Sequence, residues 1–144
     1  MNYGDLHYLL LLAFNRSNKA IVRQTASGDL LPGQPKILEF LWEHPDCTQK
    51  EISLGCALDK STVTSLVTRM EQSGYLTKTP DVSDRRNYRI SLTDKGKEKA
   101  VWVRKICASV DKIAWQDIPS DEQKQFLETF KKILLNLETL EATI

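Results

Sequence analysis

The clearest hydrophobic pattern in the chain lies in its middle, around residues 58–74. Apolar residues recur there at intervals of three and four, at Leu58, Val63, Leu66, Val67 and Met70, as on one face of an amphipathic helix. Asp59 can accept a backbone N–H as the N-cap, and Gly74 can end the helix. The opposite face carries small hydroxyl side chains and single cations instead of the Glu and Lys typical of a solvated helix. The pattern therefore predicts a short helix whose hydrogen-bonding groups fit a groove.

A β-hairpin is predicted directly after this helix. Residues 75–79 and 88–93 alternate apolar and polar side chains and are rich in β-branched and aromatic residues, whereas residues 80–87 are turn-forming. The predicted tip carries Arg85 and Arg86. A groove-fitting helix joined to a hairpin with a cationic tip is the arrangement expected of a winged helix-turn-helix on DNA.

Further helices are predicted on the N-terminal side. Residues 5–26 have an apolar face broader than one neighbour needs, and residues 36–43 form a compact buried helix after a connector at 30–35. Thr48 is expected to cap the next helix and to form a reciprocal capping box with Glu51. The buried side of that helix is expected to consist of Ile52, Leu54, Ala57 and Leu58, with Gly55 and Cys56 in the following turn. This helix and the central one form the predicted helix-turn-helix, in which the second helix is the reader.

The chain is helical again from residue 94, with a break at 117–121, where Ser120 or Asp121 can cap the final helix. Both helices carry apolar stripes, at Ala100, Val103, Cys107, Val110 and Ala114 in the first and at Phe126, Phe130, Ile133, Leu137, Leu140 and Ile144 in the second. Such sustained spacing by three and four residues is typical of helices that pack lengthwise on partners. The surplus apolar surface at both chain ends predicts that these helices close a homodimer.

The overall charge of +1 argues against a nucleic-acid binder, but the distribution of charge does not. Ten lysines and arginines and five acidic residues lie between Lys60 and Arg104, so this segment carries +5 and the rest of the chain −4. Such an asymmetry is typical of a locally basic surface on a balanced protein. A chain of 144 residues forms one domain or a small two-lobed protomer with a modest core.

Several other classes of function find no support in the sequence. No apolar run approaches the ~20 residues of a membrane span, and the N-terminus lacks a basic region followed by a cleavage site, so we expect a cytoplasmic protein without membrane contact. A metal site would need more ligands than His44 and Cys47 provide. No nucleophile elbow, phosphate loop or paired His and acid motif appears. We therefore expect no metal, no cofactor and no enzymatic activity.

Several stretches of the sequence resemble the MarR family of bacterial transcriptional regulators. Residues 81–86, Asp-Val-Ser-Asp-Arg-Arg, and residues 92–96, Leu-Thr-Asp-Lys-Gly, are similar to the wing of that family and to the exit from it. Residues 60–64 in the reader helix, and residues 70–76 at its end, are similar to the family as well. The resemblance covers essentially the whole chain.

This resemblance implies a mainly α-helical fold with a small β-wing. It implies one domain over residues 1–144, with a winged helix-turn-helix lobe at 30–93 and a helical dimerisation region at 1–29 and 94–144. It also implies a homodimer whose reader helices enter successive major grooves of a pseudo-palindromic operator, while the wings reach the flanking minor grooves. Two-fold symmetry doubles the site and multiplies its discrimination against non-specific DNA.

The predicted function is therefore that of a sequence-specific transcriptional regulator of the repressor type, with a double-stranded DNA operator as its partner. The alternative is a winged-helix interaction adaptor without specific DNA binding. The hydroxyl groups on the reader helix and the paired arginines of the wing argue against that alternative.

The predicted DNA contacts lie on the reader helix and on the wing. The candidates are Lys60, Ser61, Thr62, Thr64, Ser65, Arg69, Arg85 and Arg86. The helix residues could instead form a solvated face, and the wing arginines could merely pair with Asp81 or Asp84. The resemblance favours a division of labour, in which Arg85 enters the narrow minor groove and Arg86 is held by Asp84.

The resemblance also implies that a chemical signal controls DNA binding. Members of the family bind small aromatic acids where the dimer helices meet the DNA-binding lobe, and some sense oxidants through a thiol. The candidates for a ligand pocket are Phe14, Trp42, Trp102 and Arg104, although the same residues suit an ordinary core. The N-terminal helix lacks the cysteine that the oxidant sensors carry there. Cys47 is the candidate redox thiol, because it precedes a helix N-terminus, which lowers the pKa of a thiol. Cys107 lies on an apolar stripe, as a small core residue does.

Overall fold

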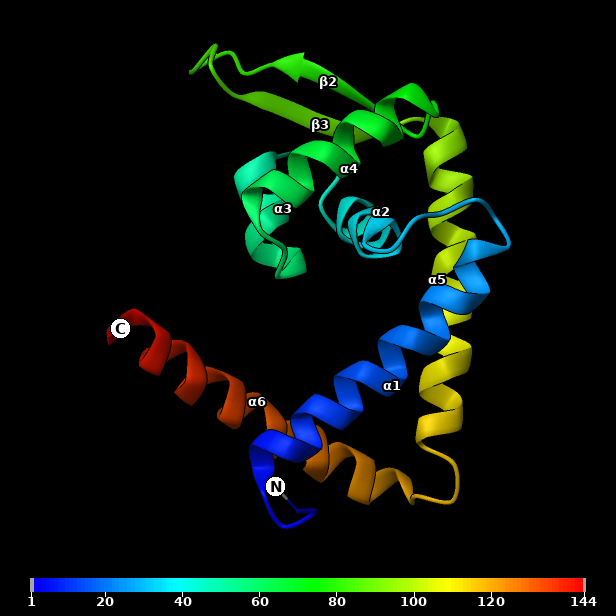
Figure 1. Cartoon of the computed structure of the whole chain (residues 1–144), viewed down its shortest axis with the longest axis vertical. Coiled ribbons are helices and arrows are strands. Elements are labelled where there is room, and N and C mark those ends of the chain that lie inside the picture. The colour runs from blue at the N-terminus through cyan, green and yellow to red at the C-terminus, as the bar shows by residue number, and fades with distance from the viewer. Residues whose placement is uncertain (1, 144) are drawn as a thin grey trace. The chain divides into compact units, whose positions relative to one another are not determined.

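The computed structural model describes residues 2–143 (Figure 1). Met1 and Ile144 lie outside these residues. The predicted last apolar stripe ends at Ile144, so its final position is not described. The packing divides the chain into two compact units, Met1–Val110 and Asp111–Ile144, so the division falls near the end of a helix and not at residue 93. The assignment of residues 1–29 and 94–144 to dimerisation stays a prediction.

The helices of the first unit match the predicted ones and confirm the mainly helical fold. They are α1 (Leu6–Ala26), α2 (Gln34–Glu43), α3 (Gln49–Cys56), α4 (Lys60–Gln72) and most of α5 (Asp94–Ala114). α2 begins two residues earlier than its apolar pattern indicates. Gly33 turns the chain there with φ +91°, and Pro35 fits the first helical turn, where no backbone N–H is needed. Gly74, with φ +81°, follows the end of α4 as expected.

A small antiparallel sheet completes the winged lobe. Strands β2 (Leu76–Pro80) and β3 (Tyr88–Leu92) form the predicted hairpin, with Lys78 opposite Ile90, and Figure 1 shows them above α4. Another strand, β1 (Cys47–Thr48), pairs with the other edge of β3, so the strand order is β1-β3-β2. With two residues, β1 is too short for an alternating pattern to be recognised, and the sequence did not predict it.

The hydrophobic core of the first unit lies between the helices and the sheet. Its members that are at most 1% exposed include Ile37, Leu38 and Leu41 from α2, Val63, Val67 and Met70 from α4, and Cys47, Leu76 and Ile90 from the sheet. On α5, Ala100 and Val103 are buried and Cys107 packs against this core. The predicted apolar face of the reader helix is thus buried, which turns its polar face outward.

Helix α3 is rotated relative to the prediction. Leu54, expected to be buried, is 74% exposed, and α3 packs through Ile52 and Cys56 instead. Gly55 lies inside the helix and not in the turn after it. A Cβ at Gly55 would overlap the ring of Phe40. The close approach of α2 therefore fixes the rotation of α3 and places Leu54 at the surface.

Both ends of α3 are capped. The Thr48 hydroxyl accepts the backbone N–H of Glu51 at 3.2 Å, as predicted. The reciprocal bond, from the backbone N–H of Thr48 to the Glu51 carboxylate, is absent within residues 2–143, so the capping box is half formed. At the other end, Ala57 is exposed, contrary to expectation, because it adopts the left-handed conformation (φ +52°) that turns the chain toward α4. The Ser53 hydroxyl closes this turn by donating to the carbonyl of Leu58.

The exit from α4 is packed closely against the start of α5. The Thr93 hydroxyl donates to the carbonyl of Gly74 at 2.6 Å and accepts the backbone N–H of Gly96 at 3.0 Å. A Cβ at Gly96 would overlap the carbonyl of Tyr75. Gly96 therefore allows the end of α4, the hairpin and α5 to meet, which fixes the wing relative to the reader helix.

The second unit contains the end of α5 and helix α6 (Ser120–Thr143). Ser120 and Asp121, expected to cap this helix, already lie in its first turn. The ring of Phe126 packs edge-on against Trp115, with 5.9 Å between the ring centroids. No described residue of this unit is buried, although its sequence is rich in leucine. Within residues 2–143, no helix is both long enough and apolar enough to cross a membrane.

Candidate nucleic-acid interface

The carboxylate of Asp59 organises the first turn of α4. One of its oxygens accepts the backbone N–H of Thr62 and the hydroxyl of Ser61, each at 2.8 Å, and the other accepts the hydroxyl of Thr62 at 2.9 Å. These bonds, led by the one from the Thr62 backbone, hold the pKa of Asp59 below its usual value. Asp59 is thus the predicted N-cap, and it also fixes the orientation of two hydroxyl groups.

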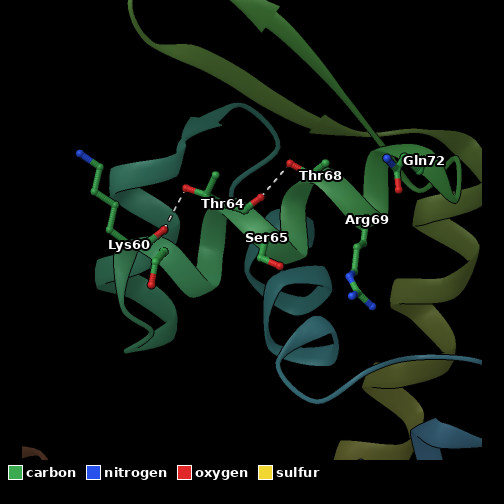
Figure 2. A pocket seen from close by; sticks show the side chains of 7 residues that line it. Lys60, Thr64, Ser65, Thr68, Arg69 and Gln72 are labelled. Carbon is green, nitrogen blue, oxygen red and sulfur yellow. Dashed lines mark hydrogen bonds between the residues drawn. The ribbon is translucent and has the colours of Figure 1, made fainter.

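The hydroxyl groups farther along α4 differ in their partners. Thr64 donates to the carbonyl of Lys60, and Thr68 donates to the carbonyl of Thr64, both at 2.9 Å (Figure 2). Such bonds to the preceding turn are common for threonine within a helix. The Thr64 hydroxyl also lies 3.3 Å from the side-chain oxygen of Gln49. Ser65 has no hydrogen-bond partner in the part of the chain that the structure describes.

An open groove of about 780 Å³ follows the exposed face of α4. It is lined by Lys60, Ser61, Thr64, Ser65, Thr68, Arg69 and Gln72. Figure 2 shows the side chains of Lys60 and Arg69 extending away from the helix, and neither forms an ion pair with any residue of 2–143. Thr62 is half-buried and does not line the groove. The structure therefore brings the predicted helix contacts together, with the exception of Thr62.

The two arginines at the tip of the wing have different surroundings. The Arg86 side chain donates to both oxygens of the Asp84 carboxylate, at 3.1 and 3.3 Å, and its backbone N–H donates as well. These bonds, the side-chain bond first, hold the pKa of Asp84 below its usual value. Asp81 accepts instead from the backbone and hydroxyl of Ser83. Arg85 has no partner among the described residues, so its whole guanidinium is available to an external group, whereas that of Arg86 is partly engaged by Asp84.

Three other cations of the basic segment are paired with acids of the lobe. Arg104 pairs with Glu43 at 3.0 Å, and the other two cations lie on the wing. Arg89 on β3 bonds to the carboxylate of Asp46 at 3.2 Å and to its backbone carbonyl at 3.1 Å. Lys78 on β2 lies 3.9 Å from the carboxylate of Glu71. These pairs join the base of the wing to the segment before β1 and to α4. Lys78 and Arg89 belong to the segment that the sequence predicts as a basic surface. In the structure, their ion pairs instead hold the wing in place.

The four predicted pocket residues do not line one cavity. Trp42 helps to line a cavity of about 390 Å³, to which Phe14, Trp102 and Arg104 do not contribute. Arg104 lies over the Trp42 ring, 5.4 Å from its centroid. Trp102 packs against the core, and Phe14 is 59% exposed. The structure thus brings Trp42 and Arg104 together, but of the four predicted residues Trp42 alone lines this cavity.

The prediction that Cys47 has a lowered thiol pKa is contradicted by the surroundings of this residue. Cys47 lies in β1, opposite Ile90, and is fully buried. Burial, followed by the nearby Glu51 carboxylate, raises the pKa of this thiol to about 12. The helix N-terminus next to it does not compensate for this loss of hydration. Among residues 2–143, no three His, Cys, Asp or Glu side chains are grouped so that they could hold a metal ion.

Comparisons with known proteins agree with this geometry. Residues 30–88 match a family model described as the MarR family. The organic hydroperoxide resistance transcriptional regulator of Bacillus subtilis (strain 168) is 37% identical over 84 residues, which are 56% of this chain and 57% of that protein. The chain spans about half the length of the curated relatives it matches. The family match begins at the start of the winged lobe and ends at the first residue of β3.

Solved structures match the fold over most of the chain. A MarR transcriptional regulator from Methanosarcina mazei Go1 has a TM-score of 0.87 at 20% identity, and the match covers 94% of this chain and 97% of that one. The transcriptional repressor CouR, solved bound to a 23-mer DNA duplex, has a TM-score of 0.79 at 24% identity, covering 91% of this chain and 93% of that one. At these identities the likeness establishes the fold of the chain.

Proposed function

Because this chain belongs to the MarR family of transcriptional regulators, we propose that it binds a double-stranded DNA operator as a homodimer and represses transcription. The observation that carries the proposal is the groove along α4, which gathers hydroxyl groups between two cations without acid partners, Lys60 and Arg69. A cationic groove with hydrogen-bonding groups suits phosphates and the edges of bases. An apolar partner surface would leave these groups unsatisfied.

In this proposal the helix and the wing have separate tasks. The N-terminal turns of α4 enter the major groove, where Ser61 and Ser65 contact base edges and Lys60 and Arg69 contact phosphates. Arg85 enters the adjacent minor groove, while Asp84 holds Arg86 and stiffens the loop. The ion pairs at the base of the wing keep it at a fixed distance from the helix.

The homodimer is supported by apolar side chains that the single chain leaves exposed. In α6, Leu134, Leu137 and Leu140 are 43 to 55% exposed, and in α1 Leu9 and Phe14 are similarly uncovered. A helix gains most of its stability from packing such a face. A two-fold dimer would cover these residues and present two reader helices to a pseudo-palindromic operator.

Release of the operator by a small aromatic ligand remains part of the proposal, with the cavity beside Trp42 as its candidate site. The B. subtilis relative is named for organic hydroperoxide resistance, but buried Cys47 does not favour release by an oxidant. The alternative function is that of a winged-helix interaction adaptor, which has the same fold but does not bind DNA specifically. Binding to chromosomal DNA would place the protein in the cytoplasm.

A mobility-shift experiment with the protein's own upstream intergenic DNA tests this function. We expect a shifted complex that survives an excess of unrelated competitor DNA and weakens steeply with added salt. A variant with both Lys60→Ala and Arg69→Ala should bind every sequence more weakly. If the wild-type complex disappears with competitor as readily as complexes on unrelated DNA do, specific recognition is wrong and the adaptor function is favoured.

A further inference from the structure

Several hydroxyl groups in the groove of α4 already form hydrogen bonds within the protein. They therefore differ in whether they can still donate a hydrogen bond to DNA. A hydroxyl has one proton to donate and lone pairs with which to accept, whereas an ionised carboxylate and a backbone carbonyl can only accept. Ser61 must therefore donate in its 2.8 Å bond to the Asp59 carboxylate. By the same reasoning, Thr64 and Thr68 donate in their 2.9 Å bonds to carbonyls of the helix.

The direction of these bonds determines what each side chain can offer to a base. Ser61, Thr64 and Thr68 have their protons engaged, so they present lone pairs to the groove. The proton of Ser65 is not engaged by any described residue, so Ser65 can donate or accept. In the major groove, adenine and cytosine present amino donors, while guanine and thymine present acceptor oxygens. The internal bonds of the helix therefore favour some bases over others.

We propose that Asp59 sets the base preference of this helix by engaging the proton of Ser61, so that Ser61 accepts a hydrogen bond from the amino group of adenine or cytosine on the strand it faces. This inference rests on the proposed DNA-binding function and adds a positioning residue to it. Asp59 acts through Ser61 and makes no base contact of its own.

Ser61 is the hydroxyl best placed for this role. It lies in the first turn of α4, is exposed and lines the groove, and the N-terminal residues of a recognition helix are those that contact base edges. Thr62 is oriented by the same carboxylate but is half-buried beside the groove. Thr64 and Thr68 bond to their own helix, as threonine does in many helices. The bond from Ser61 to a side chain before the helix is particular to this turn.

A guanine or thymine opposite Ser61 would meet the wrong polarity. Its oxygen would face the lone pairs of Ser61, unless the hydroxyl gave up its bond to Asp59 and turned its proton outward. That bond has a charged acceptor, and such bonds are about twice as strong as those between neutral groups. Either outcome weakens binding, so the mismatch should cost on the order of tenfold in affinity.

Selection of binding sites from a random-sequence DNA library tests the inference with two variants. Asp59→Gly keeps a residue type that is well tolerated at a helix N-cap but has no side-chain oxygen, which leaves the Ser61 proton free. Ser61→Ala removes the reading group and leaves the cap intact, so it carries the test if Asp59→Gly loses the helix. Ser73→Ala is the matched control, because it removes a hydroxyl group from the other end of α4, outside the groove.

For the wild type we expect adenine or cytosine to be preferred by roughly tenfold at one position in each half-site. Both Asp59→Gly and Ser61→Ala should lose that preference at the same position, while Ser73→Ala should keep it. An unchanged motif for Ser61→Ala overturns the reading role of Ser61. An unchanged motif for a folded Asp59→Gly, or a wild-type preference for guanine or thymine at the affected position, overturns the role of Asp59. A wild type that selects no motif at all refutes the proposed function itself, and with it this inference.

Discussion

The winged lobe, residues 30–93, and the second unit of the chain, Asp111–Ile144, differ in how far their apolar side chains are buried. In the lobe, helices and sheet bury them, and Ile37, Ile52 and Ile90 have no exposed surface at all. In the second unit, Phe126 is 52% and Leu135 62% exposed, and no described residue is buried.

This difference indicates which part of the fold a single chain can complete. The lobe has a core of its own, and its pairs of charged residues fix the wing to that core. α6 has 24 residues with apolar positions at helical spacing, but within one chain most of these side chains are exposed. Propensity alone gives little stability to a helix, and packing supplies the rest. The second unit therefore needs a partner surface, and a second copy is the partner we propose.

The largest expected effect comes from placing a charge on the exposed stripe of α6. Leu137→Glu would put an unpaired carboxylate into the proposed dimer contact, twice per dimer by symmetry, at a cost of several kcal/mol for each charge. We expect sedimentation to shift from dimer to monomer and operator binding to fall. The lobe should remain folded, so buried Cys47 should stay as unreactive toward thiol reagents as it is in the wild type.

Asn136→Glu is the matched control, because it adds the same charge one residue away, outside the stripe at Phe130, Ile133, Leu137 and Leu140. It should leave the dimer intact. Truncation after Asn136 removes the last turns of the stripe and should act like Leu137→Glu. A wild type that sediments as a monomer at micromolar concentration, or a Leu137→Glu variant that remains a tight dimer, would contradict the homodimer.

A second prediction tests whether the lobe is a well-packed core, with two residues of the same helix. Ile52→Ala should lower the free energy of unfolding by ~2–5 kcal/mol, because it leaves a cavity where the side chain is fully buried. Leu54→Ala should change it by less than about 0.5 kcal/mol, because that side chain is 74% exposed. Denaturant unfolding of both variants measures the difference. Equal losses would mean that α3 is rotated toward the orientation its sequence predicts.

The wing permits a smaller and more specific comparison between its two arginines. Arg85→Ala should weaken operator binding and lower the magnitude of the salt slope by about one counterion per protomer. Arg86→Ala should weaken binding less, because Arg86 is engaged by Asp84 and acts by stiffening the loop. Titration of operator DNA at several salt concentrations separates the two. An unchanged slope for Arg85→Ala would remove Arg85 from the interface.

The sequence predicted the elements of the fold well because their patterns are local. The cap at Asp59, the end at Gly74 and the alternation in the hairpin each depend on neighbours in the chain. It could not predict that Leu54 is exposed, because the rotation of α3 depends on the ring of Phe40 on another helix. The two-residue strand β1 is likewise formed by a partner distant in sequence, β3.

The candidate site shows the same limit. Because helical spacing determines which positions share a face, the sequence predicted five of the seven residues that line the groove along α4. It missed Thr68 and Gln72, and Thr62 does not line the groove. It misjudged Cys47, since the effect of a helix N-terminus on a thiol pKa depends on solvent exposure, and burial outweighs it here. It did not anticipate the bonds from Ser61 and Thr62 to Asp59, which depend on side-chain orientation and leave no pattern in the sequence.

The smallest expected effect is a change at acidic pH. It tests whether the wing behaves independently of the second unit. The folded pKa of Asp84 lies below its unfolded value of about 3.9, because Arg86 bonds to the ionised form. The ion pair therefore contributes fully above the unfolded pKa, and its contribution is lost as the pH falls through the lower, folded pKa. We expect the NMR signal of the Arg86 side-chain Nε–H to be constant at neutral pH and to shift in that acid range. Since Asp84 is at the surface, the change in stability should be slight.

Two variants make this last measurement decisive. Asp84→Asn lacks the titrating group, so the acid shift of the Arg86 signal should vanish. In Leu137→Glu the shift should keep its midpoint, because the bonds between Asp84 and Arg86 lie wholly within the wing and do not depend on the dimer contact. A midpoint at or above that of an unfolded aspartate would mean that Asp84 does not hold Arg86 in solution. A midpoint that moves in the monomeric variant would mean that the lobe depends on the dimer, so that the two regions are not independent.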